Sequence, residues 1–189
     1  MSDKATSGAS GELAGRTDCL IVIIDIQEKL LPVMSEKEAV LENSVKIASF
    51  AKVVGVPVLV TEQEKLGPTL AELSGEIDEF APILKLDFDA CTVPAFTGSL
   101  ERLGRGTVII TGIECHVCVM QTTLSLLARD YRVHVVSDAV SSRTKANRKV
   151  ALRRMRDAGA VISSTEMVIF ELLKRAGTDE FKETLKLVK

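Results

Sequence analysis

Residues 107–122 read Thr-Val-Ile-Ile-Thr-Gly-Ile-Glu-Cys-His-Val-Cys-Val-Met-Gln-Thr, and the rest of the chain can be interpreted outward from this stretch. An apolar strand passes through Gly112 into a short turn, which puts Cys118 at the start of a helix. Unpaired N–H groups and the positive end of the peptide dipole at a helix N-terminus favour thiolate over thiol and can hold an oxyanion. Cys118 is therefore a candidate nucleophile, and the alternative is a buried core cysteine.

The length and composition predict one domain. The chain has 189 residues, 46% of them hydrophobic, which is enough for a single substantial core. We expect a loose tail over 1–16, rich in Ser, Gly and Ala, and one domain over 17–189. The net charge is -2, with 24 basic and 26 acidic residues, so no strong field favours nucleic acid or an anionic membrane. A small molecule is the expected partner.

Cysteine usage and the first residues bear on the compartment. Four cysteines in a chain of this size do not make a disulfide scaffold, so we expect a reducing compartment, the cytoplasm. The first sixteen residues resemble neither a secretory signal nor a membrane anchor, and Asp3 and Glu12 argue against mitochondrial targeting. No apolar run approaches the roughly 20 residues that span a bilayer.

Apolar runs alternate with helical patterns along the chain. Residues 19–26 (Cys-Leu-Ile-Val-Ile-Ile-Asp-Ile) are typical of a strand buried on both faces of a parallel sheet. Strands are expected over 19–26, 57–61, 82–88, 106–113, 131–135 and 160–163, helices over 36–54, 94–103, 117–130, 145–158, 166–176 and 179–187, and a turn over 138–143. This alternation predicts a three-layer α/β/α, Rossmann-like doubly wound sheet of six mainly parallel strands in the order 3-2-1-4-5-6.

Two charged residues interrupt the apolar strands. In the predicted order the first and fourth strands are neighbours, so Asp25 and Cys118 face each other across the crevice where open α/β sheets bind ligands. A carboxylate at the end of a buried strand is costly unless it is paired or used, and the alternative is a capping or turn aspartate. Lys85 lies inside the apolar run 82–88, and its alternative is a solvated residue at the sheet edge.

Three motifs in this order resemble those of the isochorismatase-like cysteine hydrolases, over about residues 18–175. Residues 21–27 (Ile-Val-Ile-Ile-Asp-Ile-Gln) resemble the family's strand ending in Asp-x-Gln. Lys85-Leu-Asp-Phe-Asp89 is similar to its Lys-x-x-Phe-Ser, with Asp89 in place of the usual serine. Residues 112–119 resemble its nucleophile turn.

Two further segments also resemble the family. Residues 138–143 resemble the segment that follows the nucleophile turn in the family. Residues 60–63 (Val-Thr-Glu-Gln), with 66–69, look closest to the subgroup of isochorismatase domain-containing proteins. Some proteins of this subgroup carry a mitochondria-associated ribonuclease label, but nothing in this chain supplies a stacking platform or basic groove for RNA.

The resemblance implies a catalytic triad of Asp25, Lys85 and Cys118. It also implies a non-proline cis peptide between Ile113 and Glu114, and an oxyanion hole formed by the backbone N–H groups of Glu114 and Cys118. In the implied mechanism Asp25 takes the thiol proton, Cys118 attacks a carbonyl or amidine-like carbon, and Lys85 keeps Asp25 ionised. The expected substrate-binding residues are Gln27, Gln63 and Phe88.

The family comparison also limits the reaction. Isochorismatases proper cleave a vinyl ether and lack the nucleophilic cysteine, so Cys118 favours hydrolysis of a carbon–nitrogen bond, as in the amidase branch. We expect no cofactor and no catalytic metal. The nicotinamidases of the family bind a metal through an Asp-x-His and a nearby His, and residues 57–69 contain neither His nor Asp. The family also implies a homo-oligomer.

Other functions fit parts of the sequence. Cys115-His-Val-Cys118 is a C-x-x-C, which can be a redox pair beside a βαβ unit, but a redox function leaves the two charged candidates unexplained. A zinc site needs two further ligands, and the chain has only His116 and His134. A third alternative is a binding module that keeps the fold without the chemistry. We expect Cys115 to be a small filler beside the nucleophile.

Overall fold

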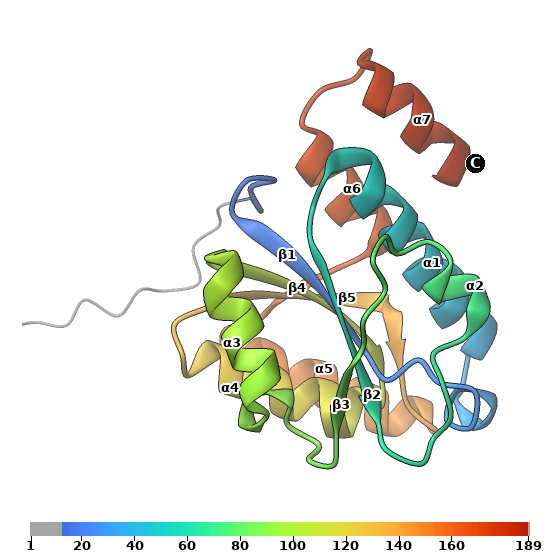
Figure 1. Ribbon diagram of the computed structural model, residues 1–189, viewed down its shortest axis with the longest axis vertical. Coiled ribbons are helices and arrows are strands. Elements are labelled where there is room, and N and C mark those ends of the chain that lie inside the picture. Colours follow the sequence, from blue (N-terminus) through green and yellow to red (C-terminus); the bar gives the residue numbers. More distant parts are fainter. Residues whose placement is uncertain (1–12, 189) are drawn as a thin grey trace, which may run out of the picture.

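The computed structural model describes residues 13–188, which form a six-stranded parallel sheet (Figure 1). The strands are β1 (Cys19–Ile24), β2 (Val58–Gln63), β3 (Ile83–Lys85), β4 (Thr107–Ile113), β5 (Arg132–Ser141) and β6 (Val161–Ser163). Their order across the sheet is β3-β2-β1-β4-β5-β6, which confirms the predicted order. The first and fourth strands are therefore neighbours at the switch point.

Helices cover both faces of the sheet and complete the predicted three layers (Figure 1). One face carries α1 (Lys37–Val54), α2 (Ala71–Ser74), α6 (Thr165–Leu173) and α7 (Asp179–Val188). The other carries α3 (Pro94–Leu103), α4 (Met120–Leu127) and α5 (Lys145–Asp157). Three short helical turns lie between these elements: η1 (Leu31–Val33), η2 (Ala90–Thr92) and η3 (Cys115–Val119).

Strand β1 is the centre of the core. All six of its residues are fully buried, because helices cover both of its faces. Cys19, Ile21 and Ile23 pack toward α1, whereas the alternate residues pack toward α3, α4 and α5. Burial of one such large aliphatic side chain contributes about 1.5–3 kcal/mol. This two-sided burial explains why the strand reads as a continuous apolar run.

The backbones of β1 and β4 meet closely at Gly112. Its φ is 116°, which side-chain-bearing residues rarely adopt, and a Cβ at this position would clash with the backbone oxygen and nitrogen of Ile24. The glycine thus lets β4 run past the end of β1 just before the turn to Cys118. The next peptide bond but one, between Ile113 and Glu114, is cis.

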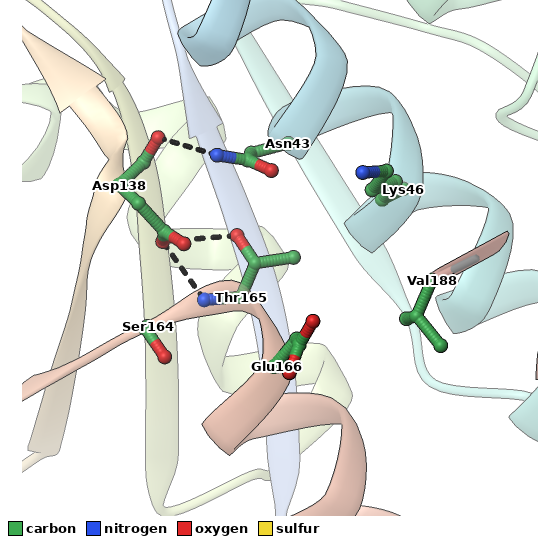
Figure 2. Close-up of a pocket in the computed structure, with 7 residues that line it drawn as sticks. All are labelled: Asn43, Lys46, Asp138, Ser164, Thr165, Glu166 and Val188. Atoms are coloured by element: carbon green, nitrogen blue, oxygen red, sulfur yellow. Dashed lines mark hydrogen bonds between the residues drawn. The ribbon is translucent and has the colours of Figure 1, made fainter.

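Strand β5 is longer than the sequence pattern indicates. It continues to Ser141 through residues where a turn is predicted, and the reason is that Asp138 has partners on two helices that cover the same face of the sheet (Figure 2). Its Oδ1 accepts hydrogen bonds from the N–H and Oγ1 of Thr165, at 2.8 and 3.0 Å, and its carbonyl accepts one from Asn43 at 2.8 Å. Asp138 therefore joins β5 to the start of α6 and to α1.

The predicted tail lies partly outside the described residues. Residues 1–12 are not described, but two residues assigned to the tail contact the domain. Ala14 is buried and donates its N–H to Glu171 at 3.1 Å, and Arg16 forms an ion pair with Glu180 at 2.9 Å. The folded part thus begins a few residues before the predicted boundary at 17. Across residues 13–188, no helix combines the length and apolarity needed to cross a membrane.

Candidate active site

Asp25 directly follows β1, and its side chain is completely buried. Its φ of 51° turns the backbone, a conformation that aspartate tolerates better than most residues. Oδ2 accepts a hydrogen bond from Lys85 Nζ at 2.6 Å, and Oδ1 accepts one from Thr61 Oγ1 at 2.7 Å. The buried carboxylate is therefore both paired and hydrogen-bonded, as its removal from water requires.

Lys85 ends the edge strand β3, yet its side chain is also completely buried. Its Nζ donates to Asp25 Oδ2 at 2.6 Å, to Gln63 Oε1 at 2.8 Å and to the carbonyl of Asp87 at 3.3 Å. Three acceptors match the three N–H groups of an ammonium. The alternative of a solvated edge lysine is wrong, because exposed Leu84 takes the outward position and Lys85 the inward one.

Cys118 lies in the π-helical turn η3, which leads into α4. The helical conformation thus begins two residues before the predicted start at 117. Burial raises the pKa of the Cys118 thiol to about 12, with the negative charge of Asp25 adding to the shift and Lys85 opposing it. Desolvation and the Asp25 charge therefore oppose the thiolate that a helix start favours. Cys118 is a thiol at neutral pH.

These three side chains come from the carboxyl-terminal ends of β1 and β3 and from the turn after β4. Asp25 and Lys85 touch, and the Cys118 thiol is within electrostatic reach of both. A carboxylate next to a thiol can accept its proton, and an ammonium next to that carboxylate stabilises the anion. The arrangement is suited to nucleophilic attack by sulfur.

Glu114 braces the nucleophile turn through its side chain. Its carboxylate Oε2 accepts hydrogen bonds from the backbone N–H and the Nε of Arg143, both at 3.1 Å. This contact joins the turn after β4 to the end of β5. The predicted contribution of the Glu114 and Cys118 N–H groups to an oxyanion hole stays a prediction.

The three predicted substrate-binding residues have different surroundings. Gln27 is buried, and its amide donates to the carbonyls of Gln63 and Gly67 and accepts from the Gln63 N–H at 2.8 Å. Gln63 accepts from Lys85 and donates to the carbonyl of Leu86 at 2.7 Å. Both amides therefore brace the protein itself. Phe88, in the loop after β3, is 52% exposed.

Two contacts near the triad were not anticipated from sequence. Thr61, the hydroxyl partner of Asp25, lies on β2 in register with Ile24, the residue before Asp25. The available signal in the sequence was the threonine that ends the apolar run 57–61. Asp89, which replaces the usual serine, accepts from the Cys91 N–H at 2.8 Å and from Ser125 Oγ, and so caps η2 against α4.

The C-x-x-C pair has the properties of buried thiols. Cys115 is fully buried, its Sγ lies 3.9 Å from the carbonyl of Arg148, and burial raises its pKa to about 12. All four cysteines are free. Reactive redox pairs need a depressed thiol pKa, and here both thiols shift in the opposite direction. His116 contacts Ser142 Oγ at 2.9 Å at the surface of the same turn.

Among the described residues, no group of three or more His, Cys, Asp or Glu side chains is arranged to hold a metal ion. Among the residues that the structure describes, Asp25 is the carboxylate beside Cys118, and its two oxygens already accept hydrogen bonds from an ammonium and a hydroxyl. The site chemistry is that of an ion pair beside a thiol.

The sequence as a whole places this fold and site in a family. The Isochorismatase domain profile matches residues 19–167, so the chain belongs to the isochorismatase family. The secreted isochorismatase effector Isc1 of Phytophthora sojae is 41% identical over 178 residues, covering 90% of this chain and 84% of that protein. Isochorismatase domain-containing protein 2A of Mus musculus is 37% identical over 173 residues, covering 90% and 82%. These relatives confirm the family inferred from the motifs.

Solved structures share the architecture. The MAR1 ribonuclease of Caenorhabditis elegans has a TM-score of 0.88 and 35% identity, covering 94% of this chain and 92% of that one. YcaC of Pseudomonas aeruginosa, solved with hexane-2,5-diol and covalent acrylamide, has a TM-score of 0.88 and 24% identity over 94% and 92%. YcaC of Escherichia coli, described as an octameric hydrolase of unknown specificity, has a TM-score of 0.84 and 23% identity over 93% and 87%.

Proposed function

We propose that the protein is a cysteine hydrolase that cleaves a carbon–nitrogen bond of an amide-type small molecule through a thioester on Cys118. The observation that carries the proposal is the buried ion pair of Asp25 and Lys85 beside the buried Cys118 thiol. A fully desolvated charge pair is a poor device for stability alone, since apolar residues of similar size serve equally well. Its position beside a thiol gives it a chemical use.

In the first half-reaction, Cys118 Sγ attacks the substrate carbonyl carbon as its proton moves to Asp25. The proton has to leave during the attack, because the resting thiol is not ionised at neutral pH. The sulfur–carbon bond forms, the carbonyl oxygen becomes an oxyanion, and the Glu114 and Cys118 N–H groups are its proposed donors. The carbon–nitrogen bond then breaks, and Asp25 gives the proton to the leaving amine.

In the second half-reaction, water attacks the thioester carbon and Asp25 takes one water proton. The carbon–sulfur bond breaks, the carboxylic acid product leaves, and the proton returns to sulfur. Lys85 acts on Asp25 in both halves. Its three N–H groups are already donated to protein acceptors, so it acts through its charge on Asp25 and forms no direct bond to substrate.

Two features support a small substrate. The side chains of Asp25 and Lys85 are fully buried and Cys118 is 5% exposed, so only a ligand that enters the crevice reaches the sulfur. The covalent acrylamide of the P. aeruginosa YcaC structure is a small amide bound within the same fold. The ribonuclease name of the C. elegans neighbour belongs to that protein, and a buried thiol site is poorly matched to a polymeric phosphodiester.

We also propose that the chain forms a homo-oligomer in a reducing compartment such as the cytoplasm. The octameric description of E. coli YcaC, which has the same fold, supports assembly. Three apolar side chains, Leu84, Leu86 and Phe88, are more than half exposed on the edge strand β3 and the loop after it. The four free cysteines support a reducing setting.

The test is capture of the acyl enzyme from a library of small amides. Rapid acid quench followed by peptide mass spectrometry should find an acyl group on the Cys118 peptide, and hydroxylamine should remove it as expected for a thioester. Cys118→Ala should abolish both the adduct and amine release, whereas Cys19→Ala, in the core of β1, should retain them. Amide hydrolysis that persists in Cys118→Ala, or metal-free cleavage of RNA by the wild-type protein, would contradict the proposal.

A further inference from the structure

Strand β2 reaches the active site through the hydroxyl of Thr61. This residue is completely buried, and its Oγ1 donates to Asp25 Oδ1 at 2.7 Å. The opposite carboxylate oxygen accepts from Lys85 at 2.6 Å. A threonine hydroxyl has one hydrogen, and an ionised carboxylate can only accept, so the direction of this bond is fixed while Asp25 is charged.

The backbone makes the Thr61 contact a rigid one. Thr61 is paired with Ile24 in the β1–β2 ladder, and its carbonyl accepts the Asp25 N–H at 3.2 Å. The same residue thus binds both the main chain and the side chain of Asp25. Since each carboxylate oxygen accepts at about two positions, one position on each oxygen stays open for the thiol proton.

The charged and titratable groups that face Asp25 from the surrounding elements are few. Lys85 comes from β3 and Cys118 from η3, as described above. From β2 the contacts are neutral: Thr61 touches Asp25, and Gln63 touches Lys85. Glu62, between them, faces away and accepts hydrogen bonds from Thr69. Lys85 and Thr61 each donate a hydrogen bond to the carboxylate, and the Cys118 thiol also lies within hydrogen-bonding reach of it.

We propose that Thr61 is a positioning residue that orients the Asp25 carboxylate toward the thiol and sets the pH at which this carboxylate becomes able to accept the thiol proton. The inference rests on the proposed function, because it requires Asp25 to act as the base. A hydrogen bond to the charged form favours that form. The rate of Cys118 alkylation falls as the pH is lowered, and this low-pH side of the profile is its acid limb. Loss of the hydroxyl should therefore move the acid limb to higher pH.

Thr61→Val tests the proposal, because valine keeps the shape and removes the donor. The rate of Cys118 alkylation by iodoacetamide is measured from pH 4 to 9 by peptide mass spectrometry, which separates Cys118 from the other three cysteines. The acid limb should move up by about one to two pH units, the size expected for loss of one hydrogen bond to a charged group. Thr61→Ser, which restores the hydroxyl, should return the limb to the wild-type position.

Thr111→Val is the matched control. Thr111 is also a fully buried strand threonine, but its hydroxyl has no hydrogen-bond partner. The pH profile of Cys118 alkylation in Thr111→Val should coincide with that of the wild-type protein. If circular dichroism shows that Thr61→Val is unfolded, Thr61→Ala is used for the same alkylation profile, because it removes the hydroxyl without placing a methyl group against the carboxylate.

The outcomes separate this inference from the proposed function. If Asp25→Asn leaves the wild-type profile unchanged, Asp25 is not the base and the proposed function fails. If Asp25→Asn slows alkylation but the limb of Thr61→Val overlays that of the wild type, the positioning role alone is overturned. The same holds if Thr61→Ser behaves like Thr61→Val, because packing and not the hydroxyl would then explain the effect.

Discussion

At the scale of single residues, the most informative signal in the sequence was a charged side chain in an apolar run, because burying a charge costs free energy unless the charge is paired. It singled out Asp25 at the end of a strand with two buried faces, and the carboxylate is paired with Lys85 and bonded to Thr61. Reasoning from the helix dipole, by contrast, did not take account of the burial of the Cys118 thiol. A helix start favours thiolate by its local dipole, but how far Cys118 is removed from water depends on packing that no local pattern reveals.

Gln27 and Gln63 illustrate a second limit at this scale. Their contact with substrate stays a prediction, and in the structure their amides bind backbone groups and the Lys85 ammonium. A glutamine amide serves either purpose equally well, so residue type and spacing cannot separate them. Only the partners distinguish a residue that holds the site together from one that binds a ligand.

The raised thiol pKa of Cys115 leads to a prediction about the C-x-x-C pair. Cys115→Ala should leave the alkylation rate of Cys118 within a few-fold of wild type, because the Cys115 thiol lies against the carbonyl of Arg148. The rate is read from the Cys118 peptide after iodoacetamide treatment. A Cys115–Cys118 disulfide formed in mild oxidant, with loss of activity in either single variant, would indicate a redox protein instead.

At the scale of elements, the helices and most strands followed from periodicity and caps. The 3.6-residue pattern and Gly55 set the end of α1, and Gly55 has the left-handed φ of 67° that such a cap requires. β5 was harder to predict, because Asp138 and the serines near it are typical of turns. Their partners, Thr165 and Asn43, are distant in sequence, so the sequence pattern could not show that these polar groups are satisfied within a strand.

The approach of β4 to β1 predicts a strong effect of Gly112→Ala. The added methyl group would meet the Ile24 backbone, and φ of 116° is unfavourable for alanine. Such strain costs of order 1–3 kcal/mol before the clash is counted, so we expect at least about 2 kcal/mol of lost stability in urea unfolding. Gly98→Ala, in α3 with open space around its Cβ position, is the control and should be neutral or stabilising. Equal effects of the two substitutions would contradict the account of β4.

At the scale of the whole molecule, the alternation of strands and helices was enough to predict the sheet order. Parallel strands need crossover connections of one hand, which leaves few topologies, and the observed order is one of the common ones. The convergence of Asp25 with the turn after β4 follows from that order. The surroundings of Lys85 do not, because β3 is only three residues long and its inward face is decided by pairing with β2.

The buried thiols predict a loss of stability in alkali. Burial raises the pKa of Cys19 from 9.0 to about 11 and those of Cys91, Cys115 and Cys118 to about 12. Above about pH 9 the unfolded chain releases these protons while the folded protein keeps them, so stability falls as pH rises, by about 1.4 kcal/mol per thiol and pH unit at most. In urea titrations between pH 9 and 10.5, Cys19→Ala should show a shallower decline than wild type. Parallel declines would contradict the thiol origin.

The proposed assembly gives a prediction about mass. Light scattering should find a multiple of the 20.4 kDa chain, and Leu84→Lys combined with Leu86→Lys should lower it, because both leucines are exposed on the edge strand β3. Val150→Lys, an equally exposed apolar position on α5, serves as the control and should not change the mass. A wild-type monomer at micromolar concentration would contradict the proposed homo-oligomer.

The central claim is that Asp25 activates Cys118, and site-resolved alkylation at neutral pH tests it most directly. Iodoacetamide is added to the wild-type protein, to Asp25→Asn and to the control Asp179→Asn, and labelling is followed on each cysteine peptide. Asp179 is a suitable control because its side chain, on α7, is 97% exposed. The account predicts that Cys118 of the wild type and of Asp179→Asn is labelled first. Asp25→Asn should slow this labelling at least about tenfold, which is less than the roughly 10²–10⁴-fold that a general base typically contributes. Equal Cys118 labelling rates in a folded Asp25→Asn protein and in wild type would contradict it.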